Sequence, residues 1–246
     1  MTAVRPAVVR PIGAGSAVRD GAGPAATALR AAGLAATGLS MLLFAVLHVG
    51  AHGVHPVRDT LSDYALTRDR WLFDLAVLVL AAGSALLLAP LSGGARRHRG
   101  AGRHAGWRRT AARAAFAAWC LGLTVLVVFP RDPVGAATTA AGDIHRWAAV
   151  AALCGLPVGA LLTAVRHPGR CVAAVVVASA GCLVALLPFA TAYLVGSPLR
   201  PAVGLLERTV SVGEVVVLLL TTRLCRPADG PPRGSSGRRR RELEPY

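Results

Sequence analysis

Six long apolar runs, separated by short polar segments, set the pattern of this 246-residue chain. A helix of about 20 residues spans the ~30 Å hydrocarbon core of a bilayer. In lipid such a segment must satisfy its backbone hydrogen bonds internally, which favours helices. The pattern therefore predicts an all-α integral membrane protein, a six-transmembrane-helix bundle. The runs cover approximately residues 31–50, 71–91, 111–129, 147–165, 171–195 and 203–224.

Composition leaves little room for anything outside this bundle. The hydrophobic fraction is 54%, only 16% of residues are charged, and the mean hydropathy is +0.54. These values are high for a soluble domain. We expect one membrane domain over residues 28–225, with disordered tails rich in arginine, proline and glycine at 1–27 and 226–246.

The distribution of positive charge predicts the orientation of the chain. All 27 basic residues are arginines, a bias typical of GC-rich bacterial genomes, and the net charge is +15. Twenty of them lie before run one, between runs two and three, between runs four and five, after run six, or, for Arg113 and Arg223, just inside the adjoining ends of runs three and six. Basic residues next to membrane segments stay cytoplasmic, so both termini are predicted to be cytoplasmic, in a bacterial cytoplasmic (inner) membrane. The outer loops are then 51–70, 130–146 and 196–202.

The same distribution bears on partners. Arginines grouped at one side of the spans suit the anionic headgroups of the lipid bilayer. They do not form the basic patch of a separate domain that nucleic acid would need. We therefore expect lipid contacts and no nucleic acid.

Cofactor and metal chemistry have weak support in the sequence. Five cysteines fall within the apolar runs or at their inner ends, with no CxxC pair, so they predict neither a disulfide nor a thiolate site. His48 and His52 have the i, i+4 spacing of a shared metal and His55 is near, but a third ligand at a diagnostic spacing is missing. No nucleophile elbow or phosphate-binding loop is present. We expect no catalytic residues, no cofactor and no metal.

The sixth run carries its polar residues on one face. Gly204, Glu207, Ser211 and Glu214 are spaced i, i+3, i+7 and i+10, which stacks them along a helix. Glu214 would lie roughly 10 Å deeper than Glu207. A charge at that depth costs about 2.5–3.5 kcal/mol, so Glu214 should face the bundle interior, either paired or protonated.

Polar residues from the other outer segments converge at the same side. The predicted outer-half polar pocket contains one hydroxyl group, one imidazole, one guanidinium and four carboxyl groups. Its candidate residues are Ser62, Asp63, Asp132, His145, Glu207, Arg208 and Glu214. The alternative is a buried polar network that only orders the helices.

Two further features concern helix packing. Gly155 and Gly159 form a GxxxG pair in the fourth run, where small residues let another helix approach closely. Trp119 falls in the middle of the third run, and its indole N–H should need a hydrogen-bond partner.

Three motifs, taken in order, carry a resemblance to a known family. The first motif contains Arg58-Asp-Thr-Leu-Ser62-Asp-Tyr. The second consists of Phe129-Pro-Arg-Asp132-Pro followed by Gly142-Asp-Ile-His145, and the third is Gly204-Leu-Leu-Glu207-Arg208. Over about residues 28–225 the chain resembles the bacterial membrane family catalogued as domain of unknown function 998. The resemblance implies a six-helix membrane protein without an established activity. It draws attention to Ser62, Asp132, His145 and Arg208.

These observations favour a non-enzymatic bundle that binds or handles a lipid or other amphiphile through the outer pocket. Three alternatives stay open. They are an intramembrane metal- or water-dependent hydrolase using Asp132 and His145, a proton-coupled transporter using Glu214, and a purely structural membrane subunit.

Overall fold

A computed structural model describes residues 23–50, 53–92, 103–133, 135–165, 170–194 and 198–224. Within these ranges the chain is helical and has no strand. The short 3-10 helices η1 (Leu61–Leu66) and η3 (Arg200–Ala202) lie in two of the connections. The long helices are α1 (Pro24–Gly50), α2 (Arg70–Ser92), α3 (Arg103–Val128), α4 (Ala140–Ala164), α5 (Arg170–Leu194) and α6 (Val203–Arg223).

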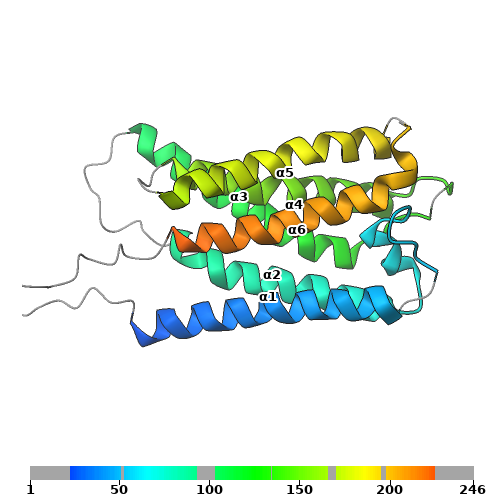
Figure 1. Cartoon of the computed structure of the whole chain (residues 1–246), viewed down its shortest axis with the longest axis horizontal. Helices are drawn as coiled ribbons and strands as arrows, with labels where there is room; N and C mark the ends of the chain where they lie inside the picture. The colour runs from blue at the N-terminus through cyan, green and yellow to red at the C-terminus, as the bar shows by residue number, and fades with distance from the viewer. Residues whose placement is uncertain are drawn as a thin grey trace, which may run out of the picture.

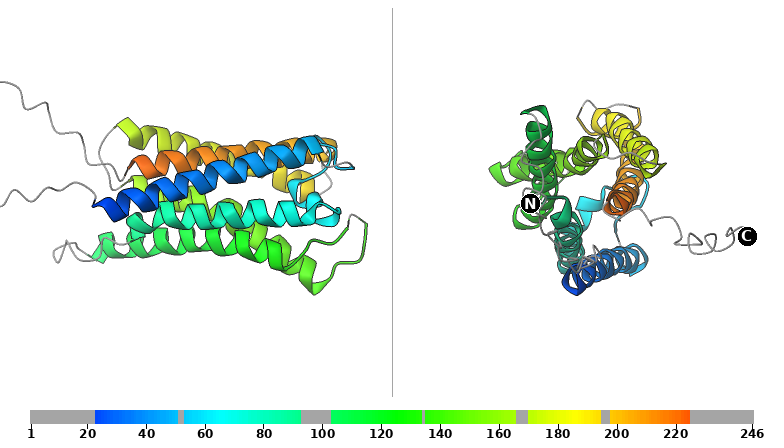
Figure 2. Two further views of the ribbon diagram at one scale, coloured as in Figure 1. Left: turned by 90° about the horizontal axis from the view of Figure 1, so that it is seen from below. Right: turned by 90° about the vertical axis from the view of Figure 1, so that its left-hand side faces the viewer.

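The helices run alternately up and down one bundle (Figure 1). The start of α1 and the end of α6 lie at one end, which we call the terminal end. The other end, called the loop end, carries η1, η3 and the connection between α3 and α4. The closest packing joins α1 to α2, α3 to α4 and α5 to α6. Seen along the bundle, these three antiparallel pairs surround a centre (Figure 2).

Five helices, α1 to α5, are long and apolar enough to cross a membrane. The chain is therefore a multi-pass membrane protein. The sixth helix, α6, has 21 residues but contains Glu207, Arg208, Glu214 and Arg223, which lower its hydropathy. The six predicted runs are all helical, whereas the structure supports five candidate spans by length and composition.

The outer surface of the bundle fits an apolar surrounding. Large hydrophobic side chains such as Leu42, Leu121 and Val177 are exposed on the helices, as expected where lipid replaces water. Trp71 and Trp147, near the loop-end starts of α2 and α4, are also exposed. Indole rings prefer the interface between membrane and water, so these residues mark the loop-end interface.

Three helix starts differ from the predicted runs. α4 begins at Ala140 rather than 147, because the Thr139 side chain caps it by accepting a 3.1 Å hydrogen bond from the Gly142 N–H. α3 begins at Arg103 rather than 111. α1 begins at Pro24, so the predicted disordered tail 1–27 is wrong for its last four residues; proline suits the first position of a helix. The other tail residues, apart from Gly23, lie outside the described ranges.

Candidate functional site

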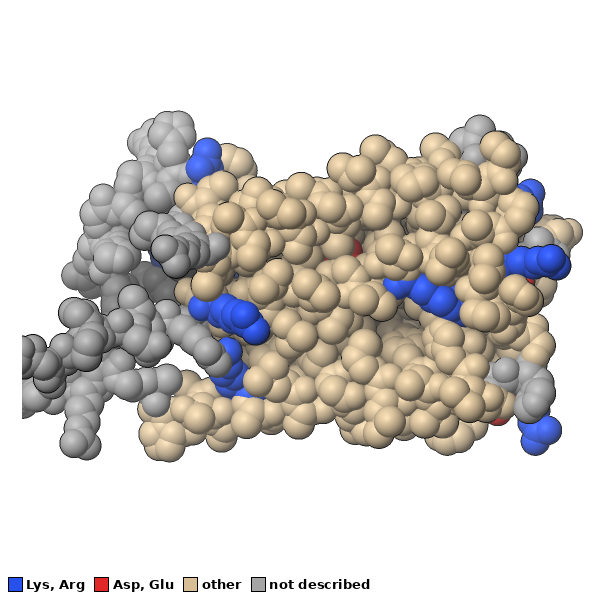
Figure 3. All heavy atoms as spheres, viewed as in Figure 1, with Lys and Arg blue, Asp and Glu red and all other residues tan. Residues whose placement is uncertain are grey.

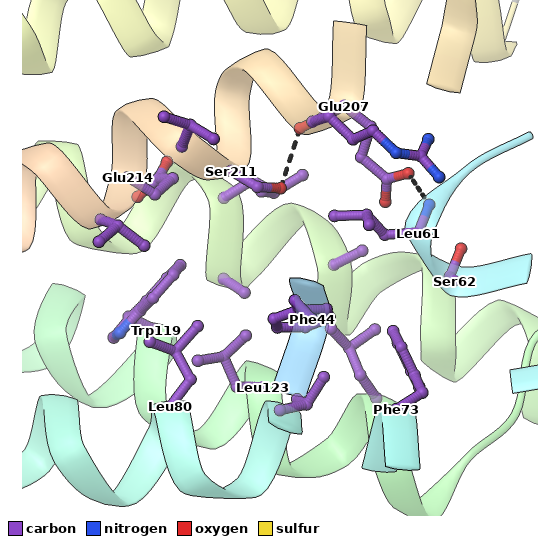
Figure 4. A pocket seen from close by; sticks show the side chains of 18 of the residues that line it. Phe44, Leu61, Ser62, Phe73, Leu80, Trp119, Leu123, Glu207, Ser211 and Glu214 are labelled. Carbon is purple, nitrogen blue, oxygen red and sulfur yellow. Dashed lines mark hydrogen bonds between the residues drawn. The ribbon is translucent and has the colours of Figure 1, made fainter. Parts of the chain in front are cut away.

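A cavity of about 360 Å³ lies inside the loop-end half of the bundle. Its wall is mostly apolar, with Leu80, Leu123 and Leu126 among the lining residues. Figure 4 shows α6 on one side and side chains of α1, α2 and α3 facing it. Five of the seven predicted site residues line this cavity: Ser62, His145, Glu207, Arg208 and Glu214.

The polar face predicted for α6 points into the cavity. Glu207, Ser211 and Glu214 all line it, and Ser211 donates its hydroxyl hydrogen to the Glu207 carbonyl oxygen at 2.9 Å. Gly204, the first residue of the predicted polar face, is not among the lining residues and instead packs against the chain before η1. A Cβ atom at Gly204 would lie 2.1 Å from the Asp59 carbonyl oxygen, so only glycine lets the start of α6 dock against the connection before η1.

Glu207 and Arg208 bind that connection at the loop end of the cavity. The Leu61 N–H donates to the Glu207 carboxylate at 2.5 Å. Arg208 donates from Nη1 to the Asp59 carbonyl oxygen at 2.6 Å and to the Gly204 carbonyl oxygen at 3.0 Å. Both charged side chains therefore hold the connection between α1 and α2 against α6.

Arg208 also bridges α6 to α1. Its Nε donates to His48 Nε2 at 2.8 Å, and His48 Nδ1 lies 2.7 Å from the Phe44 carbonyl oxygen. A neutral His48 with its proton on Nδ1 satisfies both bonds, because Nδ1 then donates and Nε2 accepts. This bridge joins two helices that have little direct packing.

The cavity opens through the side of the bundle between α1 and α6. His48 of α1 and Val212 of α6 both line it and are exposed, Val212 by 63%. The surface between these helices is hollowed beside a basic side chain (Figure 3). A molecule in the surrounding apolar phase can therefore reach the cavity without passing through the loop end.

Glu214 lies at the deeper part of the cavity. It is 1% exposed, and neither carboxyl oxygen has a hydrogen-bond partner among the described residues. The buried indole N–H of Trp119, on the opposite wall, also has none, so the need for a partner predicted for Trp119 is unmet within the described chain. Unpartnered buried polar groups are costly and need an explanation.

Asp63 and Asp132 do not line this cavity. They lie in a second hollow of similar size at the loop end, which is polar and whose lining includes Arg58, Arg131 and Arg200. His145 lines both spaces. The seven predicted residues thus divide between two neighbouring sites rather than forming one pocket.

Comparison with protein families agrees with the motifs. A family model described as "Protein of unknown function (DUF998)" matches residues 17–224. The chain belongs to the DUF998 family. The resemblance predicted from the motifs is confirmed, and the match starts earlier than predicted. No curated protein and no solved structure matches the chain.

Arg131 is the central residue of the loop end in this DUF998 protein, although it is not among the seven residues predicted from the sequence. It is 7% exposed, and its Nη1 contacts Asp63 Oδ1 at 2.8 Å, Thr60 Oγ1 at 2.5 Å and Ser62 Oγ at 3.3 Å. Asp63 also accepts from the Thr60 N–H and hydroxyl. One sequence signal could have identified Arg131. It is one of the few arginines on the predicted outer side, where arginine is uncommon by the positive-inside rule.

Two DUF998 motif residues are engaged in backbone contacts. Asp132 accepts hydrogen bonds from the Thr139 N–H at 2.8 Å and from its hydroxyl at 2.7 Å. His145, at the second turn of α4, has Nδ1 2.8 Å from the Phe129 carbonyl oxygen. Both side chains therefore fix the connection between α3 and α4.

The Asp132 contacts predict a pH dependence. The N–H and hydroxyl of Thr139 hold the pKa of the Asp132 carboxyl below its ordinary value of 3.8. Ionisation of Asp132 therefore favours the folded state; this contribution is complete above pH 3.8 and is lost as the pH falls through the folded pKa. We expect Asp132→Asn to melt at a lower temperature than the native chain at neutral pH, with the difference vanishing in acid. Melting curves across this range check the prediction, and a difference independent of pH would contradict it.

Metal-ligating groups do not gather in the described part of the DUF998 chain. No set of three or more His, Cys, Asp or Glu side chains there could hold a metal ion. His52, part of the histidine pattern weighed above, lies outside the described residues. Four cysteines are described and are free: Cys120, Cys154, Cys171 and Cys182.

Proposed function

We propose that this DUF998 protein lies in the cytoplasmic membrane of a bacterium and binds a lipid or other amphiphile in the cavity between its helices. The observation that carries the proposal is an apolar cavity with polar groups at defined points and a lateral opening between α1 and α6. Its volume of about 360 Å³ falls at the lower end of the roughly 300–1,000 Å³ typical of small-molecule sites. Such a space suits part of an amphiphile, such as one hydrocarbon chain.

The proposal includes α6 as a sixth span. Its low hydropathy comes from residues that face the cavity or the two ends, whereas Val210, Val217 and Leu218 are buried in the bundle. A helix whose polar groups face protein need not be apolar all round. With six spans, both ends of the domain lie on one side, and the arginine distribution makes that side cytoplasmic.

In this orientation the loop end faces outward, and the cavity opens to the outer half of the bilayer. Lipids and other amphiphiles concentrate in this layer, so a lateral opening gives them direct access. Reporter fusions that placed residues 96–109 outside the cell would contradict the orientation.

Filling the cavity tests binding. Ala149 of α4 lines the cavity, whereas its neighbour Val150 does not and is exposed on the outer face. We expect Ala149→Phe to abolish retention of a co-purified lipid or amphiphile in native mass spectrometry, because the ring occupies the ligand space. Val150→Phe should retain it as the native chain does.

The matched pair separates the cavity from nonspecific lipid. Ligand retained equally by Ala149→Phe, Val150→Phe and the native chain would place it on the outer surface and contradict the proposal. Melting temperatures of both variants establish that each is folded.

A further inference from the structure

We propose that the cavity selects amphiphiles with a positively charged amine, and that Glu214 binds the ammonium group. This inference rests on the proposed function, because it names the ligand class of the same cavity. It concerns the deep part of the cavity, where the buried carboxyl group of Glu214 lies without a partner.

The charged residues of the cavity lining differ in how far their hydrogen bonds are satisfied. Glu207 already accepts from the Leu61 N–H, and Arg208 donates to His48, Asp59 and Gly204. Only Nη2 of Arg208 is buried without a partner, whereas both oxygens of Glu214 are. Trp119 Nε1 and Arg208 Nη2 are unpartnered donors of the lining, and Glu214 is the carboxyl group of the lining whose two oxygens both lack a donor among the described residues.

The charges of the cavity lining also favour a cation. Its described charged groups are two carboxyls, Glu207 and Glu214, and one guanidinium, Arg208. With all three ionised and His48 and His145 neutral, the lining carries a net charge of −1. A singly charged cation neutralises this lining, and an ionised carboxyl in an apolar space is stable only with such a partner.

Aromatic rings also line the cavity. Trp119 lies across the cavity toward the Glu214 end, whereas Phe44 and Phe73 lie nearer the loop end (Figure 4). Aromatic faces attract ammonium groups, most strongly where water is excluded. The Glu214 carboxyl group, with the Trp119 ring across an otherwise apolar space, is complementary to an ammonium group on a hydrocarbon body. A lipophilic amine has this chemistry, whereas a fatty acid or an alcohol of the same length lacks the positive charge.

Three probes of equal chain length test the charge preference: dodecylamine, dodecanol and dodecanoate. The full chain is purified in a non-ionic detergent near pH 7, where an alkyl amine is protonated, as a lysine side chain is. Binding is measured by native mass spectrometry and by the shift in melting temperature. We expect dodecylamine to bind at least ten-fold more tightly than dodecanol, and dodecanoate to bind more weakly than either.

Two variants then assign the preference to Glu214. Glu214→Gln keeps the shape but removes the charge, so the affinities for dodecylamine and dodecanol should become nearly equal. Asp143→Asn removes the charge of an exposed carboxyl of α4 that does not line the cavity, and should leave the preference for dodecylamine in place. The comparison of the three probes uses the native chain alone, so the charge preference can be measured even if a variant does not fold.

The outcomes separate this inference from the proposed function. Equal binding of dodecylamine and dodecanol by the native chain, both blocked by Ala149→Phe, would overturn the role of Glu214 and leave amphiphile binding intact. A preference for dodecylamine that persists in Glu214→Gln would also overturn it. Failure of all three probes to bind the cavity would contradict the proposed function itself.

Discussion

Replacing Arg131 with alanine will lower the free energy of unfolding by about 3 kcal/mol, since removal of one partner leaves the other buried charge uncompensated. The Arg131 and Asp63 side chains are only 6% and 17% exposed, and their atoms lie 2.8 Å apart. The guanidinium also contacts Thr60 and Ser62. The Arg131 side chain joins the connection after α3 to η1 and its N-cap residue Thr60. The substitution removes all of these contacts. Unfolding in detergent micelles, followed by circular dichroism, measures the loss.

A matched arginine provides the control. Arg146 pairs with Asp143 at 3.2 Å, one helical turn away, but both side chains are about half exposed. Exposed pairs contribute roughly 0–1 kcal/mol, so Arg146→Ala should change stability little. Equal effects of the two substitutions would show that Arg131 is not the structural centre of the loop end. Loss of amphiphile binding in Arg131→Ala with unchanged stability would move it from a structural to a ligand-binding role.

Much of the fold could be predicted from the sequence because spanning a membrane requires long apolar segments. Long apolar runs can only be helices in lipid, and all six predicted runs are helical. Helix ends were less predictable because they extend beyond the lipid-facing runs. The first turns of α4 contain Asp143, His145 and Arg146, whose polarity suggested a loop, while the cap at Thr139 makes them helical.

The candidate site was predictable where one helix carries it. Spacing alone placed Glu207, Ser211 and Glu214 on one face of α6, and all three line the cavity. Spacing could not show that Asp63 and Asp132 lie in the neighbouring hollow, because that depends on how three connections fold together. It also could not reveal the bridge from Arg208 to His48, which joins residues 160 positions apart.

Substituting Gly155 with alanine will destabilise the bundle by about 1–3 kcal/mol, as expected when extra atoms are forced into a packed interior. A Cβ atom there would lie 2.6 Å from the Ala115 carbonyl oxygen and 2.9 Å from the Trp119 backbone nitrogen. Both are backbone atoms of α3, so side-chain rotation cannot relieve the clash and the two helices must separate. The most extensive helix packing in the bundle, between α3 and α4, depends on this contact. The small residues of the Gly155–Gly159 pair therefore allow α3 to approach α4 closely.

Gly181 of α5 receives the same substitution as the control. A Cβ atom at Gly181 would meet nothing within 4 Å. Alanine is favoured over glycine inside a helix by about 0.5–1 kcal/mol, so Gly181→Ala should match or slightly exceed native stability. The opposite order, with Gly155→Ala more stable than Gly181→Ala, would contradict the close approach of α3 and α4. Because α3 carries Trp119 and Leu123 into the cavity wall, Gly155→Ala should also weaken amphiphile binding, whereas Gly181→Ala should leave it unchanged.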